Sequence, residues 1–188
     1  VASLRTVTEY ELNNTYYVPF IKSVYSNLLN NTPVSSTTYY NSFLQRGSAL
    51  QKRFFLRSDR IYSVNSITNS YTNTVNSLWD NNGNLAITTT DINGIETIAT
   101  QSYSWVGNGS WCTHLPQKIS VTKTRTGSPQ INSLTEFTYN SQGSPIVKID
   151  FANSGNDCKV TNGYTYNGYG NVTNLLSTAI VSGSSQER

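Results

Sequence analysis

The chain has 188 residues, of which 12% are charged and 12% aromatic, and its formal net charge at pH 7 is +3. Its basic residues are scattered and are not interleaved with aromatic residues, so we expect no nucleic-acid-binding surface. No run of about 18 apolar residues occurs, so we expect no membrane span. The length suits one domain that is large enough to bury a hydrophobic core, and residues 1–188 are interpreted as a single segment.

Strand candidates follow one another along the chain, separated by Asn, Gly and Pro. A change of phase within residues 54–68 predicts a bulge, and residues 48–52 are the one candidate for a short helical turn. All connections are short, so the pattern predicts an all-β antiparallel meander of successive hairpins. The expected strands are residues 4–12, 18–29, 34–40, 54–68, 71–79, 85–92, 95–105, 117–126, 131–139, 146–150, 159–166 and from 172 onward.

One turn motif recurs three times, as an aromatic residue, Asn or Asp, two spacers and Gly. The residue in the second position accepts backbone N–H groups through its side chain, and Gly tolerates the left-handed conformation that closes the hairpin. Three such turns between strand-like runs indicate an internal repeat. The repeated residues are Trp79, Asp80 and Gly83, then Tyr139, Asn140 and Gly143, and finally Tyr166, Asn167 and Gly170.

Several further motifs occur in order from about residue 97 to the end. They are Trp111-Cys112, Leu115-Pro116, the run 119–124, Phe137-Thr138-Tyr139-Asn140 and the run 159–173. In this order and spacing they resemble the Rhs/YD-repeat family, which includes shell-forming components of bacterial insecticidal toxin complexes, Rhs polymorphic toxins and the animal teneurins. The sequence has Thr113-His114 where a Leu-Gly pair is more usual, and Asn replaces the typical Asp in the last two turns.

The resemblance implies that the chain is part of a curved YD-repeat sheet, or shell, that encloses a toxin or effector region. The chain contains no Met, which we interpret as a sign that it is a piece of a larger, secreted or cell-surface bacterial protein. The expected partners are the remaining repeats and the enclosed region, with a delivery component as a further candidate. Such a wall needs no catalytic residue, metal or cofactor, so the prediction is that the segment is not an enzyme.

Few residues suggest other chemistry. His114 is the only histidine, and the spacing of Cys112 and Cys158 does not fit a zinc ribbon, so we expect no metal site. A nucleophile at Cys112 with His114 as base lacks an orienting third group. A distant carboxylate pair such as Glu96 with Glu136 stays open. Both a disulfide between the two cysteines and two free thiols remain possible.

The alternative function is a cell-surface β-domain that binds carbohydrate or protein through exposed aromatic residues. Its candidate contact residues are Trp105, Trp111 and Tyr169. Aromatic residues that face each other across successive strands favour the shell, whereas aromatic residues gathered in one exposed patch favour the binding module.

Overall fold

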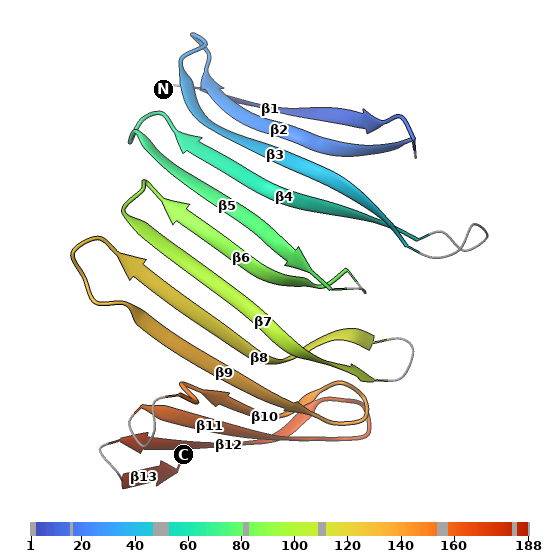
Figure 1. Ribbon diagram of the computed structural model, residues 1–188, viewed down its shortest axis with the longest axis vertical. Coiled ribbons are helices and arrows are strands. Elements are labelled where there is room, and N and C mark those ends of the chain that lie inside the picture. The colour runs from blue at the N-terminus through green and yellow to red at the C-terminus, as the bar shows by residue number, and fades with distance from the viewer. Residues whose placement is uncertain are drawn as a thin grey trace. The chain divides into compact units, whose positions relative to one another are not determined.

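A computed structural model describes residues 3–15, 17–46, 53–80, 83–108, 112–153, 158–181 and 184–187. The candidate helical turn at 48–52 and the residue Trp111 lie outside these ranges. Within them the chain forms strands and turns (Figure 1). The strands are β1 (Leu4–Asn13), β2 (Val18–Leu28), β3 (Pro33–Arg46), β4 (Arg53–Asn65), β5 (Ser70–Trp79), β6 (Leu85–Ile92), β7 (Glu96–Asn108), β8 (Cys112–Arg125), β9 (Ile131–Tyr139), β10 (Pro145–Asp150), β11 (Lys159–Tyr166), β12 (Val172–Val181) and β13 (Ser184–Glu187).

The strands of the described residues follow one another in chain order in a single antiparallel sheet, with β1 and β13 at the two ends of that order. Each hairpin turn places a strand beside the one that precedes it, as short connections require in an antiparallel sheet. This confirms the predicted all-β hairpin meander.

The chain divides into two compact units, which are described separately. Unit 1 comprises Val1–Ser77 and Thr88–Thr97, and unit 2 comprises Leu78–Ile87 and Ile98–Arg188. Unit 1 therefore contains β1 to β4 entirely, and unit 2 contains β8 to β13 entirely.

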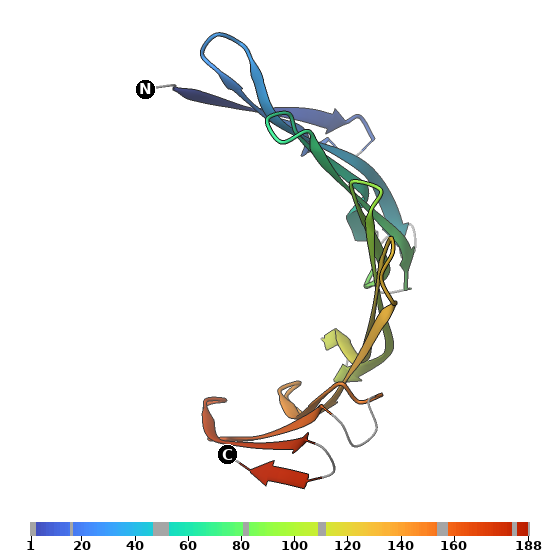
Figure 2. The same ribbon diagram turned by 90° about the vertical axis from the view of Figure 1, so that its left-hand side faces the viewer.

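Each unit is a single layer of strands, with no helix or second sheet over either face in the part of the chain that is described (Figure 2). No large side chain among the described residues is less than 2% exposed. The described residues therefore form no fully buried core, although the length of the chain is sufficient for one. The strands are neighbours in chain order, so among the described residues no element lies across a face of the sheet to bury it.

The two faces of unit 1 differ in chemistry, because residues paired in register share a face. One face carries mainly hydroxyl groups, and Thr37 Oγ1 lies 2.9 Å from Ser63 Oγ across the β3–β4 pair. The other face carries tyrosine and valine side chains. The first row contains Thr8, Val24, Thr37, Ser63 and Thr72, and the second contains Val7, Tyr25, Ser36, Val64 and Tyr71.

The predicted bulge lies in β4. Tyr40 pairs with Arg60 and Asn41 pairs with Ser58, so Asp59 is the additional residue. A bulge leaves the local ladder disrupted and bends the strand, and the polar groups that it frees require other partners.

Candidate functional site

The three repeated turns of unit 2 reverse the chain by the same pair of backbone hydrogen bonds. In each, the Gly N–H donates to the carbonyl of the Asn or Asp three residues earlier, at 3.2 Å in the first turn and 3.0 Å in the other two. The N–H of that Asn or Asp donates to a carbonyl four residues later. These closing bonds join Asp80 N to Asn84 O, Asn140 N to Ser144 O, and Asn167 N to Asn171 O, at 2.9, 2.9 and 3.0 Å.

The Asn or Asp side chain adds further bonds inside each turn. Asp80 Oδ1 accepts the N–H of Asn84 at 2.8 Å, and Asn140 Oδ1 accepts the N–H of Ser144 at 2.9 Å. Asn167 Oδ1 accepts the N–H groups of both Tyr169 and Asn171 at 3.0 Å. Asn and Asp can replace each other in this role because the contacts use an oxygen that both side chains carry.

The turn glycines share one backbone conformation. The φ angles of Gly83, Gly143 and Gly170 are 86°, 85° and 82°, in the left-handed region that side chains with a Cβ disfavour. A type I turn followed by a residue in this region is a common hairpin connection. The sequence spacing therefore places Gly where the backbone requires it.

A tyrosine hydroxyl fastens each of the last two turns to the preceding strand. Tyr139 Oη donates to Pro116 O at 2.8 Å, and Tyr166 Oη donates to Pro145 O at 2.6 Å. Both hydrogen bonds are partly buried. Each gives a partner to a phenol hydroxyl and to a backbone carbonyl that have reduced access to water. Trp79 carries an indole in place of the phenol in the first turn.

A cleft of about 490 Å³ lies between the second and third turns. Tyr164, Tyr166 and Ile146 contribute its apolar surface, and Asn140 and Gln142 contribute amide groups. Beside it, Tyr169 is 93% exposed. This region combines aromatic rings with uncharged polar groups.

Aromatic side chains also meet across neighbouring strands of unit 1. The rings of Tyr62 in β4 and Tyr71 in β5 lie 5.9 Å apart, and the Arg60 guanidinium lies 5.3 Å from the ring centre of Tyr40. Tyr71 Oη donates to Asp91 Oδ2 at 3.2 Å. Partial burial, followed by this hydrogen bond, raises the pKa of Tyr71, because both favour the neutral phenol.

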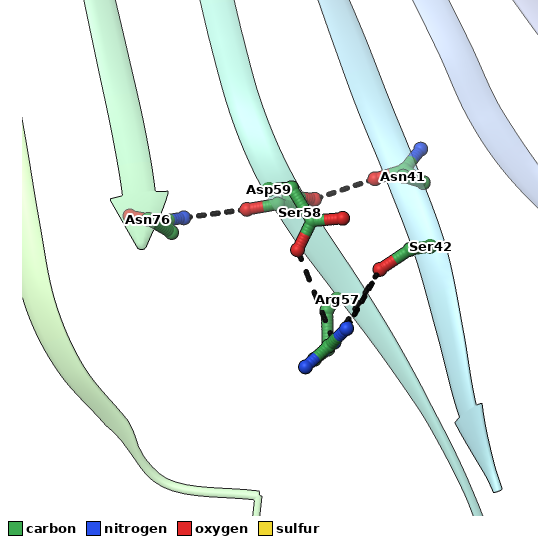
Figure 3. A network of polar contacts seen from close by, with 6 residues as sticks. All are labelled: Asn41, Ser42, Arg57, Ser58, Asp59 and Asn76. Carbon is green, nitrogen blue, oxygen red and sulfur yellow. Dashed lines mark hydrogen bonds and ion pairs between the residues drawn. The ribbon is translucent and has the colours of Figure 1, made fainter. Parts of the chain in front are cut away.

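A polar network surrounds the bulge of β4 and joins it to both neighbouring strands (Figure 3). Asn76 in β5 donates through Nδ2 to Ser58 O at 2.6 Å, and Ser58 Oγ donates to Asn41 Oδ1 in β3 at 2.6 Å. Arg57 Nε donates to Ser42 Oγ at 3.3 Å. Asn76 therefore supplies the donor for a carbonyl at the position where the bulge interrupts the regular ladder.

Asparagine side chains extend this network along unit 1. Asn41 Nδ2 donates to Ile21 O at 3.0 Å, and Thr88 Oγ1 donates to Asn76 Oδ1 at 3.0 Å. The bonds connect β2 to β6 by way of Asn41, Ser58 and Asn76. Sequence analysis missed these residues, because an isolated Asn within a strand carries no signal of which distant carbonyl it binds.

The remaining candidate residues show no assembled reaction centre in the described part of the chain. Cys158 is an exposed free thiol, and the side chains of Cys112 and Trp105 lie outside what the structure describes. Glu136 Oε1 lies 2.7 Å from Lys118 Nζ, and the bond to Glu136 raises the pKa of that lysine. Within the described ranges there is no cluster of three or more His, Cys, Asp or Glu side chains placed to hold a metal, and no helix with the length and hydropathy of a membrane span.

Comparison of the chain with protein-family models, with curated proteins and with solved structures finds no match. The resemblance to the Rhs/YD-repeat family therefore remains a prediction from the sequence.

The structure brings some of the predicted residues together. Pro116, part of the Trp111-Cys112 to Pro116 motif, contacts Tyr139 of the second turn, and Pro145 makes the equivalent contact with Tyr166. Sequence analysis had assigned no role to the tyrosine hydroxyls. A signal was present in the spacing, because each Pro precedes its Tyr by a similar interval, 23 residues in one case and 21 in the other.

Proposed function

We propose that the chain is a non-enzymatic wall segment of a Rhs-like YD-repeat protein, and that the wall encloses a toxin or effector region. The observation that carries this proposal is the equivalence of the three turns, with their common hydrogen bonds and left-handed glycines. A repeated hairpin of this kind extends a sheet strand by strand without needing a buried core. In this proposal the parent protein is secreted or at the cell surface.

The tyrosine-to-proline bonds support the wall interpretation. They join neighbouring strands through groups at the hairpin ends, Tyr139 to Pro116 and Tyr166 to Pro145. Each of these bonds links one strand to its neighbour. The same kind of bond can therefore form again wherever a further repeat adds strands to the sheet. The partners that the proposal names are the other repeats of the parent chain and the enclosed region, with a delivery component as a further one.

Protease protection in the complete protein encoded by the parent gene tests the proposal. The enclosed region should resist a protease in the wild-type protein and become sensitive when Tyr139→Phe and Tyr166→Phe are combined with Gly170→Val to open the wall. Tyr169→Phe, at a 93% exposed side chain, is the matched control and should leave protection unchanged. A parent protein that has no protected region, or whose protection survives the triple variant, contradicts the proposal.

A second candidate is a cell-surface module that binds carbohydrate or protein. The observation that favours it is the cleft beside Tyr169, with Tyr164 and Tyr166 in its lining. Trp105 and Trp111, the other aromatic contacts expected for this function, lie where side chains are not described. Binding to immobilised glycans or proteins that Tyr169→Ala abolishes, in a protein without a protected region, would select this candidate over the wall.

A further inference from the structure

Three Asn-Gly pairs have both residues in the described part of the chain: Asn93-Gly94, Asn162-Gly163 and Asn167-Gly168. Asn followed by Gly is the pair most prone to deamidation, because the backbone nitrogen after Asn attacks the side-chain amide and Gly offers no Cβ to obstruct it. Asn is accordingly among the chemically labile residues of proteins. The surroundings of each pair decide which of them reacts.

Two of the pairs have their attacking nitrogen occupied. The N–H of Gly94 donates to Asp91 Oδ1 at 2.9 Å. Gly163 lies within β11 and is paired with both neighbouring strands. A nitrogen held in a hydrogen bond or in a sheet cannot swing toward the preceding side chain without breaking local structure.

The third pair lies in the exposed third turn and differs in its attacking nitrogen. Among the described residues, the N–H of Gly168 makes no hydrogen bond, and a Cβ added to Gly168 would meet no atom within 4 Å. The Asn167 carboxamide oxygen accepts two N–H groups, from Tyr169 and Asn171, each at 3.0 Å. These donors polarise the side-chain carbonyl and are placed to stabilise negative charge that develops on its oxygen during attack.

We propose that Asn167 is a spontaneous deamidation site. The backbone nitrogen of Gly168 forms a bond to Asn167 Cγ, the Cγ–Nδ2 bond breaks, and ammonia leaves with the proton of the Gly168 N–H. One water then opens the cyclic imide. Entry of water at the side-chain carbonyl gives aspartate, and entry at the main-chain carbonyl gives isoaspartate. The net change consumes one water and releases one ammonia, and needs no other reactant.

The two products have different consequences for the turn. Aspartate keeps the side-chain oxygen that accepts the two N–H groups, and Asp80 accepts the N–H four residues later in the first turn. It adds a negative charge beside the cleft between the second and third turns. Isoaspartate lengthens the backbone by one methylene and so breaks the closing bond from Asn167 N to Asn171 O. Both products carry the new carboxylate, so the reaction yields one charged, folded turn and one charged, opened turn.

Peptide mapping by mass spectrometry, after incubation of the purified chain at mildly alkaline pH, tests the proposal. We expect Asn167 to be lost first, well before Asn93 and Asn162. Gly168→Ala should slow the loss several-fold with the turn intact, because φ of Gly168 lies outside the left-handed region and the space around it is open. An unchanged unfolding midpoint shows that the variant is folded.

A gain of reactivity in the second turn provides an independent arm. Asn140 makes the same contacts there but is followed by Ser141, so Ser141→Gly should create a new site of conversion at Asn140. The proposal is overturned if Asn167 stays intact while Asn93 or Asn162 reacts, if Gly168→Ala reacts as fast as the wild type, or if Ser141→Gly leaves Asn140 unconverted.

Discussion

The bulge of unit 1 and the repeated turns of unit 2 both accommodate backbone groups that a regular ladder leaves without partners, but they do so at different ranges. In each turn, one Asn or Asp side chain binds N–H groups two or four residues away. At the bulge, Asn76 reaches across to Ser58 of another strand, 18 residues away in sequence. The turns are therefore local devices, whereas the bulge depends on the assembly of neighbouring strands of unit 1.

The largest effect that separates the two regions comes from the same substitution made in each. Asn76→Asp removes the donor to Ser58 O and places a carboxylate against that carbonyl, which should lower the unfolding free energy by about 1–3 kcal/mol. Asn140→Asp should change it by less than about 0.5 kcal/mol, because only the side-chain oxygen of Asn140 is used. Urea unfolding of both variants measures the difference, and equal effects would contradict the distinction between donor and acceptor roles.

The turn can be weakened without touching any contact. Gly170 and Gly168 both have open space around them, but Gly170 has a φ of 82°. Gly170→Ala should therefore cost about 1–2 kcal/mol from the left-handed backbone alone. Gly168→Ala should be neutral or slightly stabilising, since it reduces the entropy of the unfolded chain. The two unfolding midpoints, compared with the wild type, check this, and a destabilised Gly168→Ala would show that space or loop motion matters more than φ.

These two regions also show which features of the structure could be predicted from the sequence. The hairpin meander and the positions of the Asn and Gly residues in the turns could be predicted, because a turn is specified by residues within five positions of one another. The bulge could be located from the change of hydrophobic phase. The partners of Asn41 and Asn76 could not, because they depend on strand register, which brings together residues far apart in sequence.

Whether a sheet buries a core is also beyond what the sequence predicts. Length and apolar content allow such a core, but they do not determine whether any element folds back over the sheet. Leu56, an apolar residue of β4, is 48% exposed. A chain composed only of hairpins has no crossover to cover it, so the side chains stay half-buried between their neighbours. The tyrosine-to-proline bonds belong to the same class, since they too depend on register.

The hydroxyl bonds of unit 2 should have a smaller effect than the turn glycines. Tyr166→Phe removes one partly buried hydrogen bond to Pro145 O and should lower the unfolding free energy by about 0.5–1.5 kcal/mol. Tyr139→Phe should act similarly through Pro116. Tyr169→Phe, at a fully solvated ring, serves as the control. If all three variants unfold at the wild-type urea concentration, the bonds to proline do not stabilise the sheet.

The smallest effect concerns unit 1 and appears only at high pH. The raised pKa of Tyr71 means that folding favours the neutral phenol, which partial burial and the bond to Asp91 protect. This contribution is fully present below the ordinary tyrosine value of 10.0 and is lost as pH rises through the raised value. Tyr71→Phe has no proton to lose, so its unfolding free energy should fall less than that of the wild type above about pH 10. Taking the difference between the two chains cancels the titration of the other tyrosines. Identical pH profiles would mean that Tyr71 ionises as readily in the folded sheet as in the unfolded chain, and would contradict the raised pKa.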